Sequence, residues 1–324
     1  MIYDINGNPI EYKNTMIAEN PAFVGSPLTI FTNDGNSKIE NVDDGLLNAV
    51  SVVKINDSMY YMYYEGFGSS GGAGYNNIAL CFAYSIDGET FIKGFPQGIE
   101  APIVGTNMLL PKGSTHGQCV VKVQDETYPF RMVAIDAVNS GRIAKFWKSE
   151  DGINWEYVRQ LTNGYNDSFV SCVVRGNLIK IFLRSRKNGI RTMAMITTDI
   201  DGNVLNSTNV NEIDFQDITT QPYQASASAI DEKRELLLPT IYNPTTSEET
   251  VWALILNGSW YEKKDLNVSK VITSDVKSIY FGSGLVNIGL KTYAFYSTRN
   301  SDHDHFSMGT TKSAIKRIEV EITQ

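Results

Sequence analysis

Carboxylate, imidazole and guanidinium side chains recur at corresponding places in several similar segments of this chain. One set precedes the first strand-like run of a segment and comprises Asp43, Asp44, Asn48, His116, Asp167 and Gln224. A second set closes the following run and comprises Tyr64, Glu65, Asp136, Arg184, Arg186 and Arg299. Because paired antiparallel strands run in opposite directions, the start of one run and the end of the next lie at the same edge of a sheet. We therefore expect both sets to surround one mouth, with Asp44, His116 and Asp167 as its leading functional cluster.

The arginines of this set leave two interpretations open. Arg184 and Arg186 alternate with Ser185, so both side chains leave the strand on the same face. Paired guanidiniums suit a carboxylate or sulfate ligand, or could instead bond Glu65 or Asp136 across the mouth. Either arrangement places positive charge at the mouth.

Other candidates also have structural interpretations. Asp44 stands before Gly45 and fits a turn, and His116 could simply hydrogen-bond a loop. The run SDHDH at 301–305 holds two His and two Asp, but a single segment rarely forms a metal site without outside ligands. Three cysteines lie in apolar runs without metal-ligand spacing and are predicted to be buried thiols without a chemical role: Cys81, Cys119 and Cys172. We predict no protein-built metal site from these residues.

The glycine-rich stretch YYEGFGSSGGAGYNN invites comparison with a phosphate-binding loop. Such a loop needs a helix N-terminus and commonly a Lys followed by Ser or Thr, and neither follows here. The next residues, IALCFAYSIDG, suit a strand that ends in a turn. The stretch is predicted to be a loop at the mouth, either approaching a ligand closely or forming an ordinary long hairpin end.

Five segments share one plan, a strand of small residues, a polar turn and a more apolar strand. They begin at Ala49, Gly117, Val170, Ser226 and Gly282. Two residues further on stand Ser51, Cys119, Cys172, Ser228 and Gly284, which are again small. Small side chains are expected where several inner strands crowd one axis. Three of the segments continue into a strand that closes with Asp-Gly, a strong turn signal: SIDGETF, SEDGINW and TDIDGNV.

These repeats predict an all-β fold, a five-bladed β-propeller, with a pair of β-sandwiches as the alternative. Residues 43–324 would form the propeller as a single domain, and residues 1–42 would pack on it as an entry segment that could supply an outer strand to the last blade. The formal net charge of −8 and the pI near 5.0 argue against a nucleic-acid binder. No apolar run reaches membrane-spanning length, and the N-terminus has no visible signal peptide.

Two stretches of the chain resemble a known family. VVKINDSMYYMYYEG followed by IALCFAYSIDGETFIKG resembles the first blade of the five-bladed propeller glycoside hydrolases, the arabinanase/β-xylosidase and invertase/levanase groups. RIAKFWKSEDGINWEYV resembles the end of their second blade, and the likeness extends over roughly residues 40–200. The resemblance implies a protein that acts on a polysaccharide or oligosaccharide in a central funnel.

The resemblance also implies roles for single residues. Family members place a base or nucleophile in the first blade, a supporting Asp in the second and an acid in the third, because glycosidic cleavage needs two carboxyl groups with separated pKa values. Asp44 or Glu65 would take the first role and Asp167 the third, whereas the Asp-Pro of the second blade is missing and His116 stands nearby. Substrate contacts would come from Asn48, Tyr64, His116, Asp136, Arg184, Arg186, Gln224 and Arg299, with Tyr75 and Tyr223 as further aromatic faces. No cofactor is predicted with certainty, but a structural cation on the axis is compatible with this kind of fold, and His116 is the first place to look for it.

Alternative functions stay open. Without a complete carboxylate set, the funnel suits a non-catalytic glycan-binding or receptor-binding module. The opening MIYDINGNPIEY resembles the start of tail-fibre and other virion-associated proteins of phages that infect gut Bacteroides, which implies virion assembly or a homo-oligomer. An extracellular or virion-associated location is therefore expected. Sialidases, usually six-bladed, are a lower-ranked alternative suggested by the arginines.

Overall fold

The computed structural model describes residues 20–33, 46–67, 78–136, 143–162, 167–187, 190–205, 211–213, 221–224, 226–231, 233–257, 260–264, 268–302 and 311–323. Within these ranges the protein is all-β, and its only helical turn is the 3-10 turn η2 (Val268–Lys270). Asp43, Asp44, Tyr75, residues 68–77 and the histidines at 303 and 305 lie outside them.

The largest sheet joins the beginning of the chain to its end. Its eight strands follow the order β1-β23-β22-β21-β2-β3-β4-β5. The strands are β1 (Asn20–Asn33), β2 (Leu46–Asn56), β3 (Met59–Phe67), β4 (Ile78–Ser85), β5 (Ile92–Lys93), β21 (Ser278–Ile288), β22 (Lys291–Arg299) and β23 (Ser313–Thr323). All pairings are antiparallel except the contact of β2 with β21, a parallel bridge between Ser51 and Ser283.

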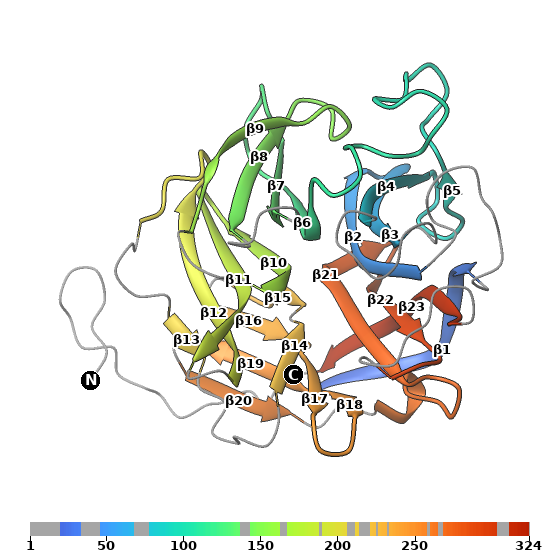
Figure 1. Cartoon of the computed structure of the whole chain (residues 1–324), viewed down its shortest axis with the longest axis vertical. Helices are drawn as coiled ribbons and strands as arrows, with labels where there is room; N and C mark the ends of the chain where they lie inside the picture. The colour runs from blue at the N-terminus through green and yellow to red at the C-terminus, as the bar shows by residue number, and fades with distance from the viewer. Residues whose placement is uncertain are drawn as a thin grey trace.

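The middle of the chain forms antiparallel sheets of neighbouring strands. One contains β6 (His116–Lys122), β7 (Phe130–Ile135), β8 (Ala144–Ser149) and β9 (Glu156–Gln160), and the next β10 (Asp167–Arg175), β11 (Leu178–Lys187), β12 (Ile190–Asp199) and β13 (Asn211–Ile213). Two smaller sheets follow, the first with β14 (Gln221–Gln224), β17 (Thr240–Asn243) and β18 (Glu248–Val251), the second with β15 (Ala227–Ala229), β16 (Arg234–Leu237), β19 (Ala253–Asn257) and β20 (Trp260–Lys264). Figure 1 shows these strand groups arranged around a common axis.

Strand β3 illustrates why the sheets stack around an axis. Its side chains alternate between the two faces of the sheet, as in any strand. Tyr60, Met62 and Tyr64 pack toward β21–β23, whereas Tyr61 and Tyr63 pack toward β6–β8. Both faces are therefore buried, which explains the unusually apolar sequence of this strand.

Apolar clusters fill the spaces between successive strand groups. They lie between β2–β4 and β6–β8, between β6–β8 and β10–β12, between β10–β12 and β15–β19, between β16–β19 and β21–β23, and between β21–β23 and β2–β4. The last of these clusters brings the chain back to its first group, so the core is a set of layers between sheets and not one central cluster.

The N-terminal segment contributes an outer strand. β1 pairs antiparallel with β23 from Asn20 opposite Thr323 to Asn33 opposite Ser313. Phe23 is 1% exposed and stacks on Phe281 at 5.4 Å between ring centroids. Burial of this ring and the added ladder of hydrogen bonds hold the beginning of the chain against its end.

Inner strands approach one another closely, as the small residues predict. A Cβ atom built on Gly282 of β21 would lie 2.1 Å from the carbonyl oxygen of Val50 of β2. Only glycine fits at this distance, which confirms the predicted crowding for this position.

The three Asp-Gly motifs form the predicted structural turns. In two of them the Oδ1 atom of the Asp-Gly aspartate accepts two backbone N–H groups, as Asp151 does from Ile153 and Asn154, both at 2.8 Å. Asp87 makes the corresponding bonds in its turn. In TDIDGNV the acceptor is Asp199, which stands two residues before the aspartate of Asp-Gly. The turns dock on a neighbouring group, since the Tyr63 hydroxyl donates to the carbonyl oxygen of Gly152 at 3.0 Å.

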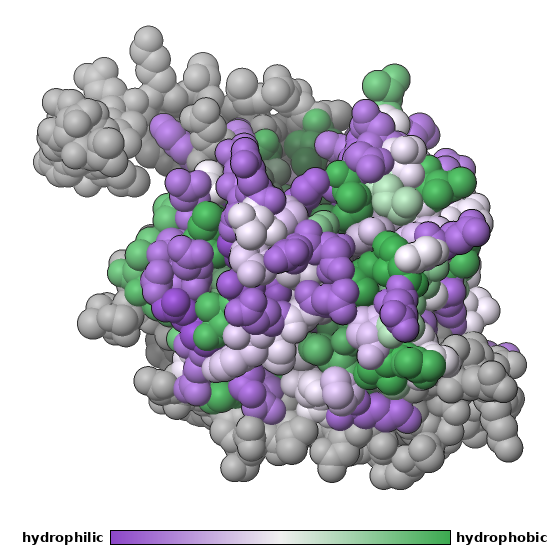
Figure 2. All heavy atoms as spheres, turned by 90° about the horizontal axis from the view of Figure 1, so that it is seen from above, coloured by the Kyte–Doolittle hydropathy of each residue, from purple (hydrophilic) through white to green (hydrophobic). Residues whose placement is uncertain are grey.

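Within the described residues, no helix is long and apolar enough to cross a membrane. On the face shown in Figure 2, hydrophobic residues occur in separate groups divided by hydrophilic ones.

Candidate functional site

Glu65, near the end of β3, is the central carboxylate of the described site. Its side chain is fully buried. Oε1 accepts a hydrogen bond from the backbone N–H of Gly117 at 2.5 Å and lies 3.0 Å from Nδ1 of His116. Oε2 is buried and has no hydrogen-bond partner among the described residues. The carboxylate is thus held by one oxygen, while the other is left for a ligand, a water molecule or a proton.

A β-bulge in β6 creates this arrangement. His116 pairs with Ile135 and Cys119 with Val133, so Gly117 and Gln118 together oppose one residue of β7. A bulge leaves a backbone group outside the ladder and re-aims the neighbouring side chains. Gly117 has φ +63°, and its N–H turns to Glu65 instead of to β7.

The same irregularity recurs in other inner strands. The register of β2 shifts between Asn48 and Ser51, and the register of β10 shifts between Asp167 and Val170. Ala49, which corresponds to Gly117 in the repeat, has φ +41°, a strained value for a residue with a side chain. In each of the three inner strands, the bulge therefore follows the candidate residue, which is Asn48, His116 or Asp167, and interrupts the regular ladder at that point.

Asn48 and His116 are both enclosed by protein groups. The Ser297 hydroxyl donates to Asn48 Oδ1 at 3.2 Å, and Asn48 lies opposite Glu65 in the strand register. The imidazole of His116 meets the ring of Phe67 edge-on, with centroids 6.2 Å apart.

Two further candidates, Asp136 and Arg299, are buried charged side chains. The first contacts a group of opposite charge and the second contacts aromatic rings. Asp136 is buried and forms an ion pair with Lys145, with 2.6 Å between Oδ2 and Nζ. The buried guanidinium of Arg299 lies over the rings of Tyr280 and Phe67, at 5.3 Å and 5.8 Å from their centroids. These ring contacts and ion pairs offset part of the cost of burying the charges.

Arg184 and Asp167 occupy opposite positions in the backbone register of β10 and β11. They are Cα partners in the register, and Arg184 is 5% exposed. For Asp167, Arg186, Tyr223 and Gln224 the structure describes the backbone only.

Tyr64, which the sequence analysis expects among the substrate contacts, lies in the core. Its side chain is fully buried between β3 and the outer strands of the large sheet, with the ring of Phe31 at 5.7 Å. Asn107 Nδ2 donates to its hydroxyl at 2.8 Å. Because Tyr64 follows Tyr63 and precedes Glu65, it points to the face of β3 opposite to theirs. Tyr64 therefore offers no ring face to a sugar in this structure.

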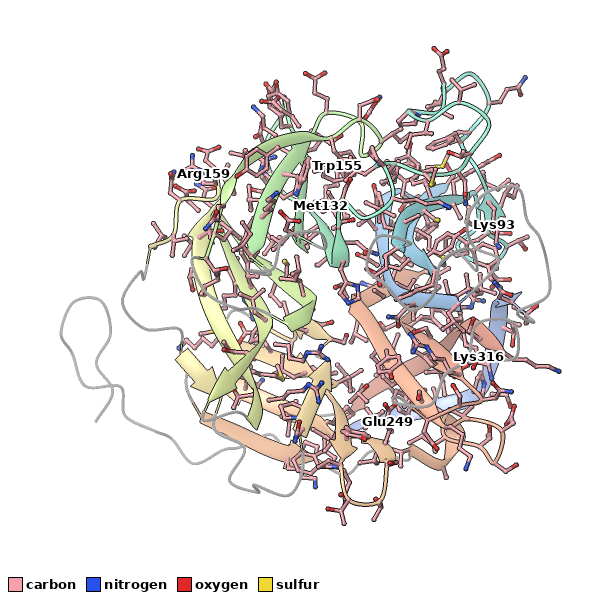
Figure 3. The ribbon with its side chains drawn as sticks, in the orientation of Figure 1. Lys93, Met132, Trp155, Arg159, Glu249 and Lys316 are labelled. Carbon is pink, nitrogen blue, oxygen red and sulfur yellow. The ribbon has the colours of Figure 1, made fainter. Side chains whose placement is uncertain are left out.

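Glu249 of β18 is a buried carboxylate that the sequence did not single out. Its Oε2 accepts the backbone N–H of Ile279 and its Oε1 accepts the Tyr280 hydroxyl, both at 3.0 Å. Figure 3 shows Glu249 between the β17–β18 hairpin and β21. The alternation of Glu249 and Val251 as buried residues of a short strand is the signal that could have revealed it.

No group of three or more His, Cys, Asp or Glu side chains gathers within the described ranges. Among these residues, Glu65 Oε2 and Gln118 Oε1 are buried acceptor oxygens without hydrogen-bond partners. The cation on the axis stays a prediction from the sequence.

Comparison with known proteins shows the fold. No protein-family model matches the chain, and no curated protein matches it in sequence. Solved structures do match along nearly its whole length. A glycoside hydrolase of the GH130 family of mannoside phosphorylases, which targets β-1,2-mannosidic linkages in Candida mannan, aligns with a TM-score of 0.61 and 13% identity over 91% of this chain and 94% of that one.

Two further structures carry different activities on the same fold. The α-L-arabinofuranosidase of Podospora anserina, solved with cellotriose, aligns with a TM-score of 0.59 and 11% identity over 94% of this chain and 97% of that one. An N-acetylgalactosamine deacetylase from F. plautii, solved with blood group B trisaccharide, aligns with a TM-score of 0.62 and 10% identity over 94% and 95%. The chain thus has the fold of the β-propeller glycoside hydrolases and related carbohydrate-active enzymes, which confirms the resemblance at the level of fold.

Proposed function

We propose that this protein is a glycoside hydrolase-like enzyme that cleaves a polysaccharide or oligosaccharide, with Glu65 as a reacting carboxylate. The observation that carries the proposal is the state of Glu65, which is fully buried, held through Oε1 by His116 and Gly117, and unpartnered at Oε2. A carboxylate fixed by one oxygen is positioned to use the other on substrate.

Glu65 takes the role of base or nucleophile, and His116 positions it. Glycosidic cleavage requires a second carboxyl group that protonates the leaving oxygen. Asp167 is proposed for this role, because its backbone lies in the bulged part of β10 opposite Arg184. Asp44 is the remaining catalytic candidate, proposed from its place in the sequence before β2.

The substrate is proposed to bind where the strand groups converge. Asn48, His116, Asp136, Arg184 and Arg299 come from four strand groups and are all buried, as Glu65 is, and Arg186 and Gln224 are added from sequence. The arginines suit a sugar that carries a carboxylate or a sulfate.

We also propose that the strand groups are five blades. Hydrogen bonding alone does not separate them, because the first and last groups share a sheet through Ser51 and Ser283 and the fourth is divided into two sheets. Five apolar layers between successive groups support the count, since each layer then separates two blades.

A panel of bacterial capsular, host and plant glycans tests the function. Released sugar is read by mass spectrometry and retained glycan by binding, for the wild-type chain, Glu65→Gln, Asp167→Asn and Asp44→Asn. Loss of a catalytic carboxylate is expected to lower release by about 10³-fold. Glu156→Gln is the matched control, because this side chain is 60% exposed and belongs to β9, which supplies none of the candidate residues.

Binding without release by the wild-type chain would overturn the hydrolase proposal. It would favour the alternative function, a non-catalytic glycan-binding or receptor-binding module such as a virion component. Release that is unchanged in Glu65→Gln would remove Glu65 from the mechanism.

A further inference from the structure

Glu249 of β18 fixes one aromatic ring of the neighbouring strand β21. Its Oε1 accepts the hydroxyl of Tyr280 at 3.0 Å, and its Oε2 accepts the backbone N–H of Ile279, also at 3.0 Å. Tyr280 is fully buried, and Glu249 is 9% exposed. Two bonds to successive residues of β21 therefore hold the carboxylate, and the carboxylate holds the tyrosine ring in place.

The ring of Tyr280 is in turn one of two rings that hold Arg299. The guanidinium carbon lies 5.3 Å from the centroid of Tyr280 and 5.8 Å from the centroid of Phe67. All three side chains are buried, and the attraction between a cation and a ring is stronger where water is excluded. A tyrosine that donates its hydroxyl proton to a carboxylate also has a more negative ring, so Glu249 strengthens this contact.

Arg299 lines a cavity of about 610 Å³ that is rich in positive charge. Lys312 and Lys316 of β23 line the same cavity. Among the described residues around it, Asp275 is the only acid, and its Oδ1 accepts the hydroxyl of Thr273 at 2.5 Å. Three cationic side chains and one carboxylate make this cavity favourable for an anion.

A guanidinium binds an anion in one orientation better than in others. Its five N–H donors lie in one plane and match the oxygens of a carboxylate or a sulfate. The two rings set the direction of this plane. A residue that fixes the Tyr280 ring can therefore control how Arg299 meets a ligand, although it acts at one remove.

We propose that Arg299 binds an anionic group, a carboxylate or a sulfate, in this cavity, and that Glu249 is a positioning residue that fixes Arg299 through Tyr280. The ligand that carries the anionic group is an acidic glycan, and this part rests on the proposed function. Binding of the anion itself does not depend on cleavage.

The test titrates the full-length chain with sodium sulfate, sodium glucuronate and glucose, at an ionic strength held constant with sodium chloride. Isothermal titration calorimetry gives the dissociation constants. The chain is also labelled with ¹⁵N-arginine for NMR, and the Nε–H signal of Arg299 is the one that disappears in Arg299→Lys. The position of this signal reports on the surroundings of the guanidinium.

We expect the wild type to bind sulfate or glucuronate and not glucose. Arg299→Lys should bind the anion at least about tenfold more weakly, because an ammonium lacks the planar donors. Tyr280→Phe and Glu249→Ala should weaken binding about five- to tenfold, the effect of about one hydrogen bond, and should move the Arg299 signal. Glu249→Gln should stay within about twofold of the wild type, since an amide can accept from Ile279 and donate to the Tyr280 oxygen.

Glu235→Gln is the matched control for a purely structural effect. Glu235 of β16 is a fully buried carboxylate whose Oε1 accepts bonds from Arg175 at 2.9 Å and from Lys180 at 2.7 Å. Glu235→Gln should lower the unfolding temperature without changing anion binding or the Arg299 signal. If Glu249 acted only on stability, its variants would behave in the same way.

Two results would overturn the anion site, the absence of sulfate and glucuronate binding by the wild type, and equal binding by Arg299→Lys. Unchanged binding in both Tyr280→Phe and Glu249→Ala would overturn the positioning role of Glu249. A chain that binds an anion but releases sugar from no glycan keeps this site and loses the hydrolase function. A chain that releases sugar but binds neither anion keeps the hydrolase function and loses this site.

Discussion

At the scale of single residues, Glu65 differs from an ordinary glutamate by its burial and by the contacts of one carboxylate oxygen. The carboxylate is buried, and its position depends on the two groups that contact Oε1, the His116 imidazole and the N–H of Gly117. Removing one donor leaves a buried charge with less compensation and also frees the side chain to turn. Both consequences can be measured separately.

His116→Ala should destabilise the fold by about 1–3 kcal/mol and lower any sugar release by about 100-fold, because Glu65 loses a charge-assisted hydrogen bond and its fixed position. His116→Asn should retain much of both, since Nδ2 of asparagine stands one atom beyond Cγ, as Nδ1 of histidine does. Urea unfolding and the glycan assay read the two effects. Equal losses in both variants would show that the bond to Nδ1 contributes little.

At the scale of elements, the Asp-Gly turns dock one strand group on another. Gly152 has φ +77°, and a Cβ atom there would lie 2.6 Å from the Tyr63 hydroxyl. Gly105 has nearly the same backbone, φ +75°, with no atom within 4 Å of such a Cβ. The two glycines therefore separate the cost of the backbone conformation from the cost of the contact.

Gly105→Ala should cost about 1 kcal/mol, the price of a left-handed conformation with a side chain. Gly152→Ala should cost about 3 kcal/mol, because the overpacked contact with Tyr63 adds to it. The free energy of unfolding in urea measures both. Equal costs would mean that the turn can shift away from β3 without loss.

The same turns predict how stability depends on pH. Burial alone would raise the pKa of the Asp151 carboxyl, but hydrogen bonds from the backbone N–H groups of Asn154 and Ile153 hold it below its usual value. The pKa values of Asp87 and Asp199 are lowered by bonds of the same kind. A depressed folded-state pKa stabilises the protein above the unfolded-state pKa of about 4, and this contribution is lost as pH falls.

The unfolding temperature should therefore stay level from pH 7 to about pH 5 and fall below about pH 4. Asp151→Asn should make the acid part of this curve shallower, because asparagine keeps an acceptor oxygen but does not titrate. Calorimetry across pH measures the curve. An unchanged slope would show that other carboxylates dominate.

At the scale of the whole molecule, β2 and β21 join the beginning of the fold to its end. Their only ladder contact is the bridge between Ser51 and Ser283, and Gly282 beside it lies against Val50. The first and last strand groups can therefore pair only if β2 and β21 approach closely at this point.

Gly282→Ala should cost about 3 kcal/mol or more, because the added methyl would overlap the backbone of β2, which cannot move aside as a side chain can. Gly289→Ala, with φ +58° and open space around its Cβ position, is the control. Denaturant unfolding gives the midpoints. Similar midpoints for both variants would show that the first and last groups do not need this close contact.

The sequence alone determined the repeat, its turns and its small inner residues, because these depend on local backbone preferences and on the alternation of side chains along one strand. It also led to the prediction that Asn48, Glu65, His116, Asp136 and Arg299 surround one mouth. Only the tertiary structure decided which groups meet. The bulge in β6 directs Gly117 to Glu65, β3 turns Tyr64 into the core, and β18 brings Glu249 to Tyr280. Such partners are far apart in the chain, and a single extra residue in a strand changes the direction of every side chain beyond it, so they follow from register and packing and not from local pattern.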